Sequence, residues 1–204
     1  MKITIVALGA LLVAAPALAQ QVRLPPISPE HFDEGQKKAA AAFEAATKRP
    51  PYGPFEKLMY SPELMTPVLS MGGYVRRRTA FGPALSELAI LVTAREWSQD
   101  YVWKSHAPAA AKEGIKQEII DAIGDGRRPT GMSADEEMCY DFSVELLRNK
   151  RVSDVTYARV KERFGEKGIV DLAAVNGYYA MIATVLNTAR VTGTEGPKLS
   201  RFPD

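Results

Sequence analysis

The stretch from Leu85 to His106, LSELAILVTAREWSQDYVWKSH, decides how the rest of the chain is interpreted. Its first half is a largely apolar segment, which is typical of a helix that is buried in a protein core. Three ionisable side chains, Glu87, Glu96 and His106, lie in or beside that segment. Ionisable groups held in apolar surroundings are typical of acid–base sites, so this stretch predicts a helical protein with a candidate site.

Helix signals continue on both sides of this stretch. Ser-Pro-Glu at 28–30 and at 61–63 places a capping Ser before a Pro at the first helical position, and Ser133 to Glu136 forms a capping box. No alternating β-strand pattern competes. The sequence therefore predicts an all-α, multi-helix bundle, with helices at about 29–48, 62–75, 83–97, 100–113, 116–124, 134–149, 154–164 and 167–191.

The last predicted helix, GIVDLAAVNGYYAMIATVLNTARV, is apolar around much of its circumference. Such a helix must pack against several neighbours or against another subunit. We therefore expect a homo-oligomer.

The N-terminal sequence predicts export. Residues 1–19, MKITIVALGALLVAAPALA, combine a short charged start, an apolar run and an A-x-A cleavage pattern at Ala17 to Ala19. We read 1–19 as a signal peptide, 20–51 as an N-terminal arm and helix, 52–192 as one helical domain, and 193–204 as a polar tail. A periplasmic or secreted protein follows, with no membrane association after cleavage.

Composition excludes several function classes. The formal net charge of the full chain is +2, so no global field favours nucleic acid or an anionic membrane. Cys139 is the single cysteine, which rules out an intramolecular disulfide and a C-x-x-C redox pair. Its apolar helical neighbours favour a small core residue over a nucleophile. The local basic run from Arg76 to Arg78 fits either a solvated turn or a clamp for a substrate carboxylate.

The candidate catalytic residues are Glu87, His106 and Glu96. A carboxylate that holds an imidazole fixes its tautomer and makes it a better base, which suits Glu87 and His106 if the chain turns back between them, at Ser98 to Asp100. A structural alternative exists for each: a packed histidine, a first-turn carboxylate stabilised by the helix dipole, and an ion pair for Glu96.

Four further side chains are candidates for substrate binding. Tyr101 and Trp103 could wall a pocket and donate a hydrogen bond, although aromatic residues at this spacing also suit a core. Arg77 and Arg95 could hold an anionic group. No metal or cofactor is expected, because Glu87, Glu96 and His106 lack the spacing of a metal-ligand motif.

Polar and aromatic residues of the last helix have mainly structural interpretations. Tyr178 and Tyr179 could line a pocket, although aromatic residues at this spacing more often belong to a core, and Asn176 and Asn187 are expected to tie helices together. The other histidine, His31, lies among Glu30 and Asp33 and is expected to be solvated.

Four motifs, taken together, carry a family resemblance. GPFEKLMYSPEL, ELAILVTAREW, YVWKSHAPAAAKEGI and VNGYYAMIATVLNTARV follow one another over most of residues 52–192. In order and spacing they resemble carboxymuconolactone decarboxylase-like proteins, whose all-helical fold is shared with the alkyl hydroperoxidase-associated disulfide reductases. The resemblance implies this fold, an oligomer, and functional positions at Glu87 and His106.

The thiol branch of that family is similar except at its cysteines. The resemblance would place these seven and four residues before His106, where this chain has Gln99 and Val102. The non-thiol branch more often reads T-A-R-H-W and Y-E-W-x-x-H, whereas this chain has Glu96 and Val102 at the differing positions. The resemblance therefore favours the non-thiol branch.

Three functions are consistent with these observations. The first is a cofactor-independent, decarboxylase-like lyase that uses Glu/His acid–base chemistry on a small carboxylate or lactone. The second is a peroxide-related antioxidant protein that lacks the C-x-x-C site. The third is a non-catalytic oligomer that binds a small molecule.

Overall fold

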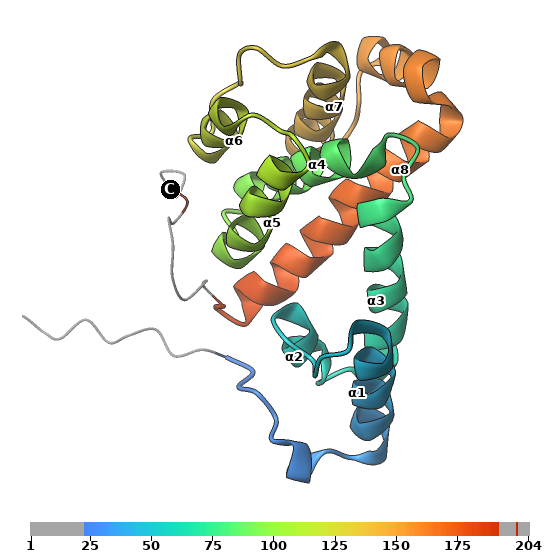
Figure 1. Ribbon diagram of the computed structural model, residues 1–204, viewed down its shortest axis with the longest axis vertical. Helices are drawn as coiled ribbons and strands as arrows, with labels where there is room; N and C mark the ends of the chain where they lie inside the picture. The colour runs from blue at the N-terminus through green and yellow to red at the C-terminus, as the bar shows by residue number, and fades with distance from the viewer. Residues whose placement is uncertain (1–22, 192–198, 200–204) are drawn as a thin grey trace, which may run out of the picture.

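The computed structural model describes residues 23–191 and residue 199, and within them the chain is helical with no strand (Figure 1). The all-α prediction is confirmed. The predicted signal peptide, and the polar tail apart from Leu199, lie outside the described residues. In chain order the elements are η1 (Pro29–His31), α1 (Glu34–Thr47), α2 (Pro54–Leu58), α3 (Pro62–Arg77), α4 (Gly82–Glu96), α5 (Asp100–Lys112), α6 (Gln117–Gly124), α7 (Ala134–Asn149) and α8 (Asp154–Thr188).

Helix α4 lies at the centre of the molecule. Every residue from Leu85 to Arg95 is buried, and the helix contacts α3, α5, α6, α7 and α8. A helix buried on all sides needs an apolar sequence around its whole circumference, which the segment LSELAILVTAR supplies. The core of the protein is therefore built around Leu85 to Arg95, the apolar half of the stretch from Leu85 to His106.

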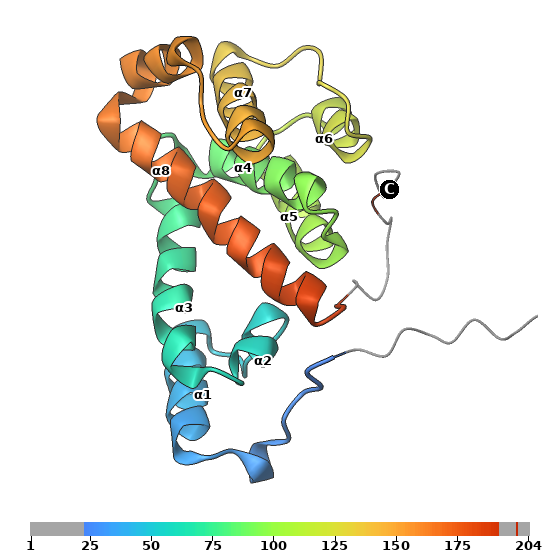
Figure 2. The same ribbon diagram turned by 180° about the vertical axis from the view of Figure 1, so that it is seen from behind.

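Helix α8 connects the two ends of the molecule. In both views it runs diagonally between α1, α2 and α3 at one end and α4 to α7 at the other (Figures 1 and 2). It contacts α2, α3, α4 and α7. Its length and hydropathy would also fit a membrane span, but half of its apolar window is buried inside the protein, as in the core helix of a soluble domain. Self-association stays a prediction from the sequence.

The structure corrects the expected helix at 29–48. Residues 29–31 form one 3-10 turn, Phe32 is extended, and the α-helix begins only at Glu34. The reason is local: the Ser28 side chain makes no capping hydrogen bond, whereas Asp33 and Gln36 form a complete capping box. Ser61 likewise makes no side-chain cap, although α3 begins at Pro62 as expected.

One short helix differs from the prediction and one predicted division is confirmed. Helix α2, Pro54–Leu58, was not predicted, because five residues are too few to show a helical period. The division expected between helices at 154–164 and 167–191 is present, because α8 consists of two helical segments joined at a kink at Gly165. Gly165 has φ 69° and ψ −176°, a conformation that is essentially restricted to glycine, so the bend depends on this residue.

Buried polar side chains join the central helices. Thr93 on α4 donates a hydrogen bond to Asn176 on α8 at 3.0 Å, and Asn176 donates to Ser143 on α7 at 3.1 Å. Asn187 accepts a hydrogen bond from Gln99, at the start of α5, at 2.7 Å. Both asparagines therefore tie helices together, as the sequence predicted.

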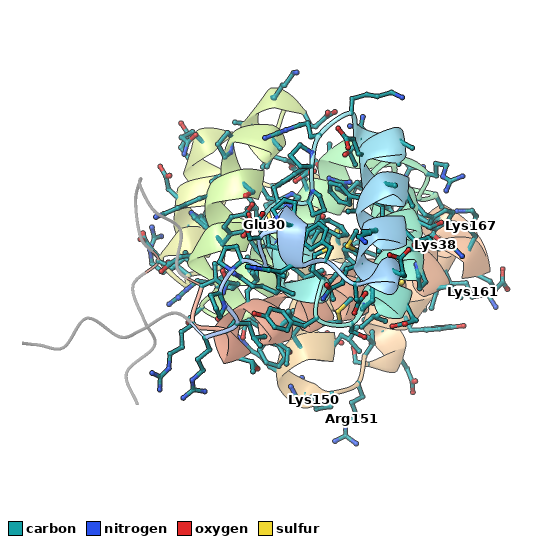
Figure 3. All side chains as sticks on the ribbon, turned by 90° about the horizontal axis from the view of Figure 1, so that it is seen from below. Glu30, Lys38, Lys150, Arg151, Lys161 and Lys167 are labelled. Atoms are coloured by element: carbon teal, nitrogen blue, oxygen red, sulfur yellow. The ribbon has the colours of Figure 1, made fainter. Side chains whose placement is uncertain are left out.

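Several charged side chains lie on the outside. Figure 3 shows Lys150 and Arg151 pointing away from the body of the protein at the turn between α7 and α8. His31 is exposed, as expected. At the N-terminus, the Lys57 amine donates to Leu24 O at 2.9 Å and the Tyr60 hydroxyl donates to Pro25 O at 2.8 Å, which fixes the arm against α2.

The bend in α8 leads to a first prediction. A Cβ at Gly165 would meet no atom within 4 Å, so Gly165→Ala changes only the backbone strain and should lower the free energy of unfolding by about 1–3 kcal/mol. Gly177 also has open space around it but lies inside regular α8, so Gly177→Ala should raise that free energy by about 0.5–1 kcal/mol. Urea denaturation of both variants measures the difference. Equal effects of the two substitutions would contradict a glycine-dependent bend.

Candidate active site

The site is built where α5 folds back onto α4. Ser98, between the two helices, has a left-handed backbone with φ 45°, and the Gln99 side chain caps α5 by accepting from Tyr101 N at 2.7 Å. The predicted break at Ser98 to Asp100 is thus confirmed. The reversal places the middle of α5 beside the start of α4.

Glu87 on α4 and His106 on α5 meet across this junction. The distance from His106 Nδ1 to Glu87 Oε2 is 2.6 Å, and the two side chains are only 13% and 9% exposed. A carboxylate can only accept a hydrogen bond, so Nδ1 carries the proton and Nε2 is the ring nitrogen that can take up another. With an ionised Glu87, the contact therefore fixes the tautomer of a neutral imidazole.

A cavity of about 440 Å³ opens beside this pair. Six helices, α1 to α5 and α8, and the loop before α2 contribute residues to it, so the cavity lies between the two ends of the molecule. It is lined by Phe43, Thr47, Tyr52, Pro54, Phe55, Leu69, Arg76, Arg77, Pro83, Glu87, Tyr101, Val102, Ser105, His106, Ala109, Lys112, Glu113, Tyr178, Tyr179 and Ile182. This volume suits a ligand of one ring or a short chain.

Aromatic side chains form two walls of the cavity: Tyr101 packs against the backbone of Gly53, and Tyr178 and Tyr179 pack against each other. Gly53 has φ 58°, and a Cβ on it would lie 2.1 Å from the Tyr101 hydroxyl, so only glycine lets Tyr101 pack there. On the other wall, Tyr179 meets His106 edge to face with ring centroids 5.0 Å apart, and Tyr178 lies 5.1 Å beyond Tyr179. The imidazole is thus fixed by a ring on one side and by Glu87 on another.

The tyrosines of the cavity are hydrogen-bond donors at neutral pH. Burial raises the pKa of Tyr178 to about 12, although the nearby Arg76 charge opposes the shift. Burial raises the pKa of Tyr179 well above its usual value, and that of Tyr101 is raised for the same reason. Each phenol therefore keeps its proton and can donate it to a ligand oxygen.

The fixed charges at the cavity are mainly positive. Arg76, Arg77 and Lys112 line it against the carboxylates of Glu87 and Glu113. Glu87 is already paired with His106, and Glu113, Arg77 and Lys112 are exposed, which leaves the half-buried Arg76 as the main charge inside the cavity. An anionic ligand is favoured by this balance.

The structure brings four predicted site residues together and leaves three outside. Glu87, His106, Tyr101 and Arg77 all line the cavity. Trp103, Arg95 and Glu96 are not among its lining residues.

The residues outside the cavity have other surroundings. Glu96 accepts two hydrogen bonds from Arg148 on α7, at 2.9 and 2.6 Å, which is the ion-pair alternative of the sequence analysis. Trp103 is buried and packs against Gly124 on α6. Arg95 is also buried, and desolvation lowers its pKa.

Sequence reasoning missed several lining residues. Ser105 and Ala109 follow Tyr101 at intervals of four residues, so a helical projection of α5 would have found them. The sequence shows Arg76 only as part of the basic run from Arg76 to Arg78, and for Tyr178 and Tyr179 it favours a position in the core over one in a pocket. No local signal marks which face of a mostly buried helix borders a cavity.

Cys139 and the possible metal ligands are the remaining candidates for reactive groups. The Cys139 thiol is buried, donates to Leu85 O at 3.3 Å, and has its pKa raised by burial. Such a thiol is a poor nucleophile. Among the described residues, no three His, Cys, Asp or Glu side chains are placed to hold a metal ion.

Comparison with known proteins shows the fold. No family model matches the sequence, and no curated protein matches it. The chain is similar in structure to an uncharacterized peroxidase-related protein from Silicibacter sp. TM1040, whose crystal structure it matches with a TM-score of 0.65 and 14% sequence identity. The match covers 83% of this chain and 88% of that one. The likeness supports an all-α, peroxidase-related type of fold.

The buried phenol gives a second prediction. In the unfolded chain Tyr178 titrates near its usual value of 10.0, while in the fold it keeps its proton to about pH 12. Over that interval the unfolded state binds fewer protons, so the free energy of unfolding falls as pH rises, by up to about 3 kcal/mol from this group.

Tyr178→Phe removes that contribution, so its unfolding free energy should fall less steeply than that of the wild type between pH 10 and 12. Urea denaturation at several pH values measures both slopes. The exposed Tyr157→Phe serves as a control for other groups that titrate in this range. Parallel curves for Tyr178→Phe and the wild type would contradict a buried, protonated phenol.

Proposed function

We propose that this protein is an acid–base enzyme in which His106 transfers a proton at a small carboxylate- or lactone-type substrate, as a decarboxylase-like lyase would. The observation that carries the proposal is the 2.6 Å contact between His106 Nδ1 and Glu87 Oε2 in the wall of a cavity. A histidine held in this way by a carboxylate is the usual form of an enzymatic general base. No cofactor takes part in the proposed step.

In this mechanism Nε2 of His106 accepts a proton from a carbon or oxygen of the bound substrate. The imidazolium that forms is stabilised by the Glu87 carboxylate, and the negative charge left on the substrate is met by phenol and guanidinium donors of the cavity. The C–C bond to the substrate's carboxyl group then breaks, CO₂ leaves, and His106 delivers its proton to the carbon that carried that group, so the imidazole returns to its initial state. Glu87 is a positioning residue, because it acts through the imidazole.

The third prediction tests this proposal. His106→Ala and Glu87→Gln should each lower the rate of proton transfer by about 10²–10⁴-fold while the protein stays folded. The double variant should be little worse than the worse single variant, because the two residues act as a unit. The assay incubates small lactones and oxo-carboxylates in D₂O and follows deuterium incorporation by NMR, which detects proton transfer whatever reaction follows.

His31→Ala is the matched control, because it removes the exposed histidine far from the cavity. Thermal unfolding of every variant separates lost activity from lost structure. A purely structural His106 would show the reverse pattern, with a lower Tm and near-normal exchange. Binding of these compounds without any deuterium exchange would favour a non-catalytic binding protein.

A peroxide-related function is the second candidate. It is favoured by the structural similarity to an uncharacterized peroxidase-related protein. Thiol-based peroxide reduction needs an accessible thiolate and a resolving partner. The buried Cys139 supplies neither feature within the described part of the chain. A peroxide reaction here would therefore have to use the His106 site instead of a thiol.

The fourth prediction separates the two candidates. Cys139→Ala should keep both the deuterium exchange and any hydroperoxide consumption at wild-type rates, because the thiol is buried in the core. The measurement compares consumption of an organic hydroperoxide by the wild type, Cys139→Ala and His106→Ala. A folded Cys139→Ala variant that loses hydroperoxide turnover would establish thiol chemistry and overturn the acid–base proposal as the main function.

A further inference from the structure

One end of the cavity is organised around a single residue, Gly72 on α3. Its carbonyl accepts a hydrogen bond from Arg76 Nε at 3.0 Å, which fixes the base of the guanidinium one turn further along the helix. A Cβ at Gly72 would lie 2.3 Å from the Tyr178 hydroxyl, so the phenol of α8 reaches this point only because the residue is glycine. The same backbone position thus holds a guanidinium and a phenol together.

Both groups retain donors for a ligand. The Nε bond uses one of the five N–H groups of Arg76, and in the part of the chain that the structure describes its terminal nitrogens make no hydrogen bond or ion pair. The Tyr178 hydroxyl also has no hydrogen-bond partner among the described residues, yet it is not sealed from the cavity. A phenol O–H or a guanidinium N–H that is buried without an acceptor lowers the stability of the protein, unless a ligand or a water molecule accepts its hydrogen bond.

The distance from the Tyr178 end of the cavity to His106 determines how long a ligand must be to contact both. Tyr179 lies between His106 and Tyr178, with ring centroids 5.0 and 5.1 Å away, so the imidazole is no more than about 10 Å from the Tyr178 ring. A molecule with one ring or a short chain can therefore reach both ends at once.

We propose that Arg76 and the Tyr178 hydroxyl form the anion subsite of this cavity and select a small organic monoanion, whose charged group they bind while its reacting atom faces His106. This inference rests on the proposed function and adds the residues that determine specificity. Arg76 is preferred over the neighbouring Arg77, because Arg76 is half-buried and anchored whereas Arg77 is exposed at the mouth. A planar guanidinium beside an O–H donor matches the two oxygens of a carboxylate.

The test uses benzoate as the probe and neutral benzamide as its uncharged counterpart. Arg76→Gln should weaken benzoate binding at least about tenfold, Arg76→Lys should give an intermediate loss, and Tyr178→Phe should cost a few-fold, since charged hydrogen bonds contribute more than neutral ones. Benzamide should bind weakly to all variants, with no dependence on Arg76. Isothermal titration at low and moderate salt measures the dissociation constants.

Arg78→Gln is the matched control. It removes the same charge from the same end of α3, but Arg78 stacks on Tyr74 at 5.2 Å and does not line the cavity. Its benzoate affinity should equal that of the wild type. An equal loss in Arg78→Gln and Arg76→Gln would show a general charge effect and overturn the subsite.

The result can be separated from that of the proposed function. His106→Ala should keep the Arg76-dependent binding of benzoate while it loses deuterium exchange. Unchanged benzoate affinity in a folded Arg76→Gln variant, or no binding of benzoate by the wild type at millimolar concentration, would overturn the subsite even if His106 proves catalytic. Arg76-dependent binding would support it even if His106 proves structural.

Discussion

The burial of α4 from Leu85 to Arg95 is the constraint on which the rest of the structure depends. A helix with no exposed face must be covered on every side, and α3, α5, α6, α7 and α8 together do this. Each polar group on that helix must then find a hydrogen-bond partner inside the protein. Without one, a buried neutral group lowers the stability by about 1–3 kcal/mol, and a charged group lowers it by more. Thr93 finds Asn176, and Glu87 finds His106.

The pairing of Glu87 serves the fold and the site at the same time. Removing His106 would leave the buried Glu87 carboxylate without its hydrogen-bond partner, and an unsatisfied buried acceptor costs about 1–3 kcal/mol. The imidazole is therefore held in one orientation by the same interaction that makes burial of the carboxylate tolerable. Because the pair borders a cavity, the contact that the buried carboxylate requires also holds the imidazole beside a space that a ligand can enter.

Two tyrosines that line the cavity pack against glycines, where any larger residue would clash with them. Gly53 admits Tyr101, and Gly72 admits Tyr178. In both cases a missing side chain on one element lets a phenol from another element approach the backbone. The resulting cavity has O–H donors, positive charge and a base. The thiol, in contrast, is enclosed by the core, so a fold of the peroxidase-related type is combined here with a site that has no accessible cysteine among the described residues.

The sequence by itself determined the helices, because amphipathic period, caps and breaks are local signals. The capping box at Ser133 and the break at Ser98 were both read correctly, and Asn176 was identified as a tie between helices. It also paired Glu87 with His106, through a family resemblance and not through geometry. Where two local signals competed, as at Ser28 and Asp33, the better cap decided the helix start.

Only the tertiary structure decided which polar residues face the cavity. Glu96 and Glu87 share one apolar helix, but Glu96 meets Arg148, which is 52 residues away in the chain. Arg76 and Tyr178 have no sequence relation, and Gly72 joins them through a contact between α3 and α8. Such pairings depend on how helices are packed and rotated against each other. That rotation is set by the sum of many side-chain contacts, and no single stretch of sequence contains it.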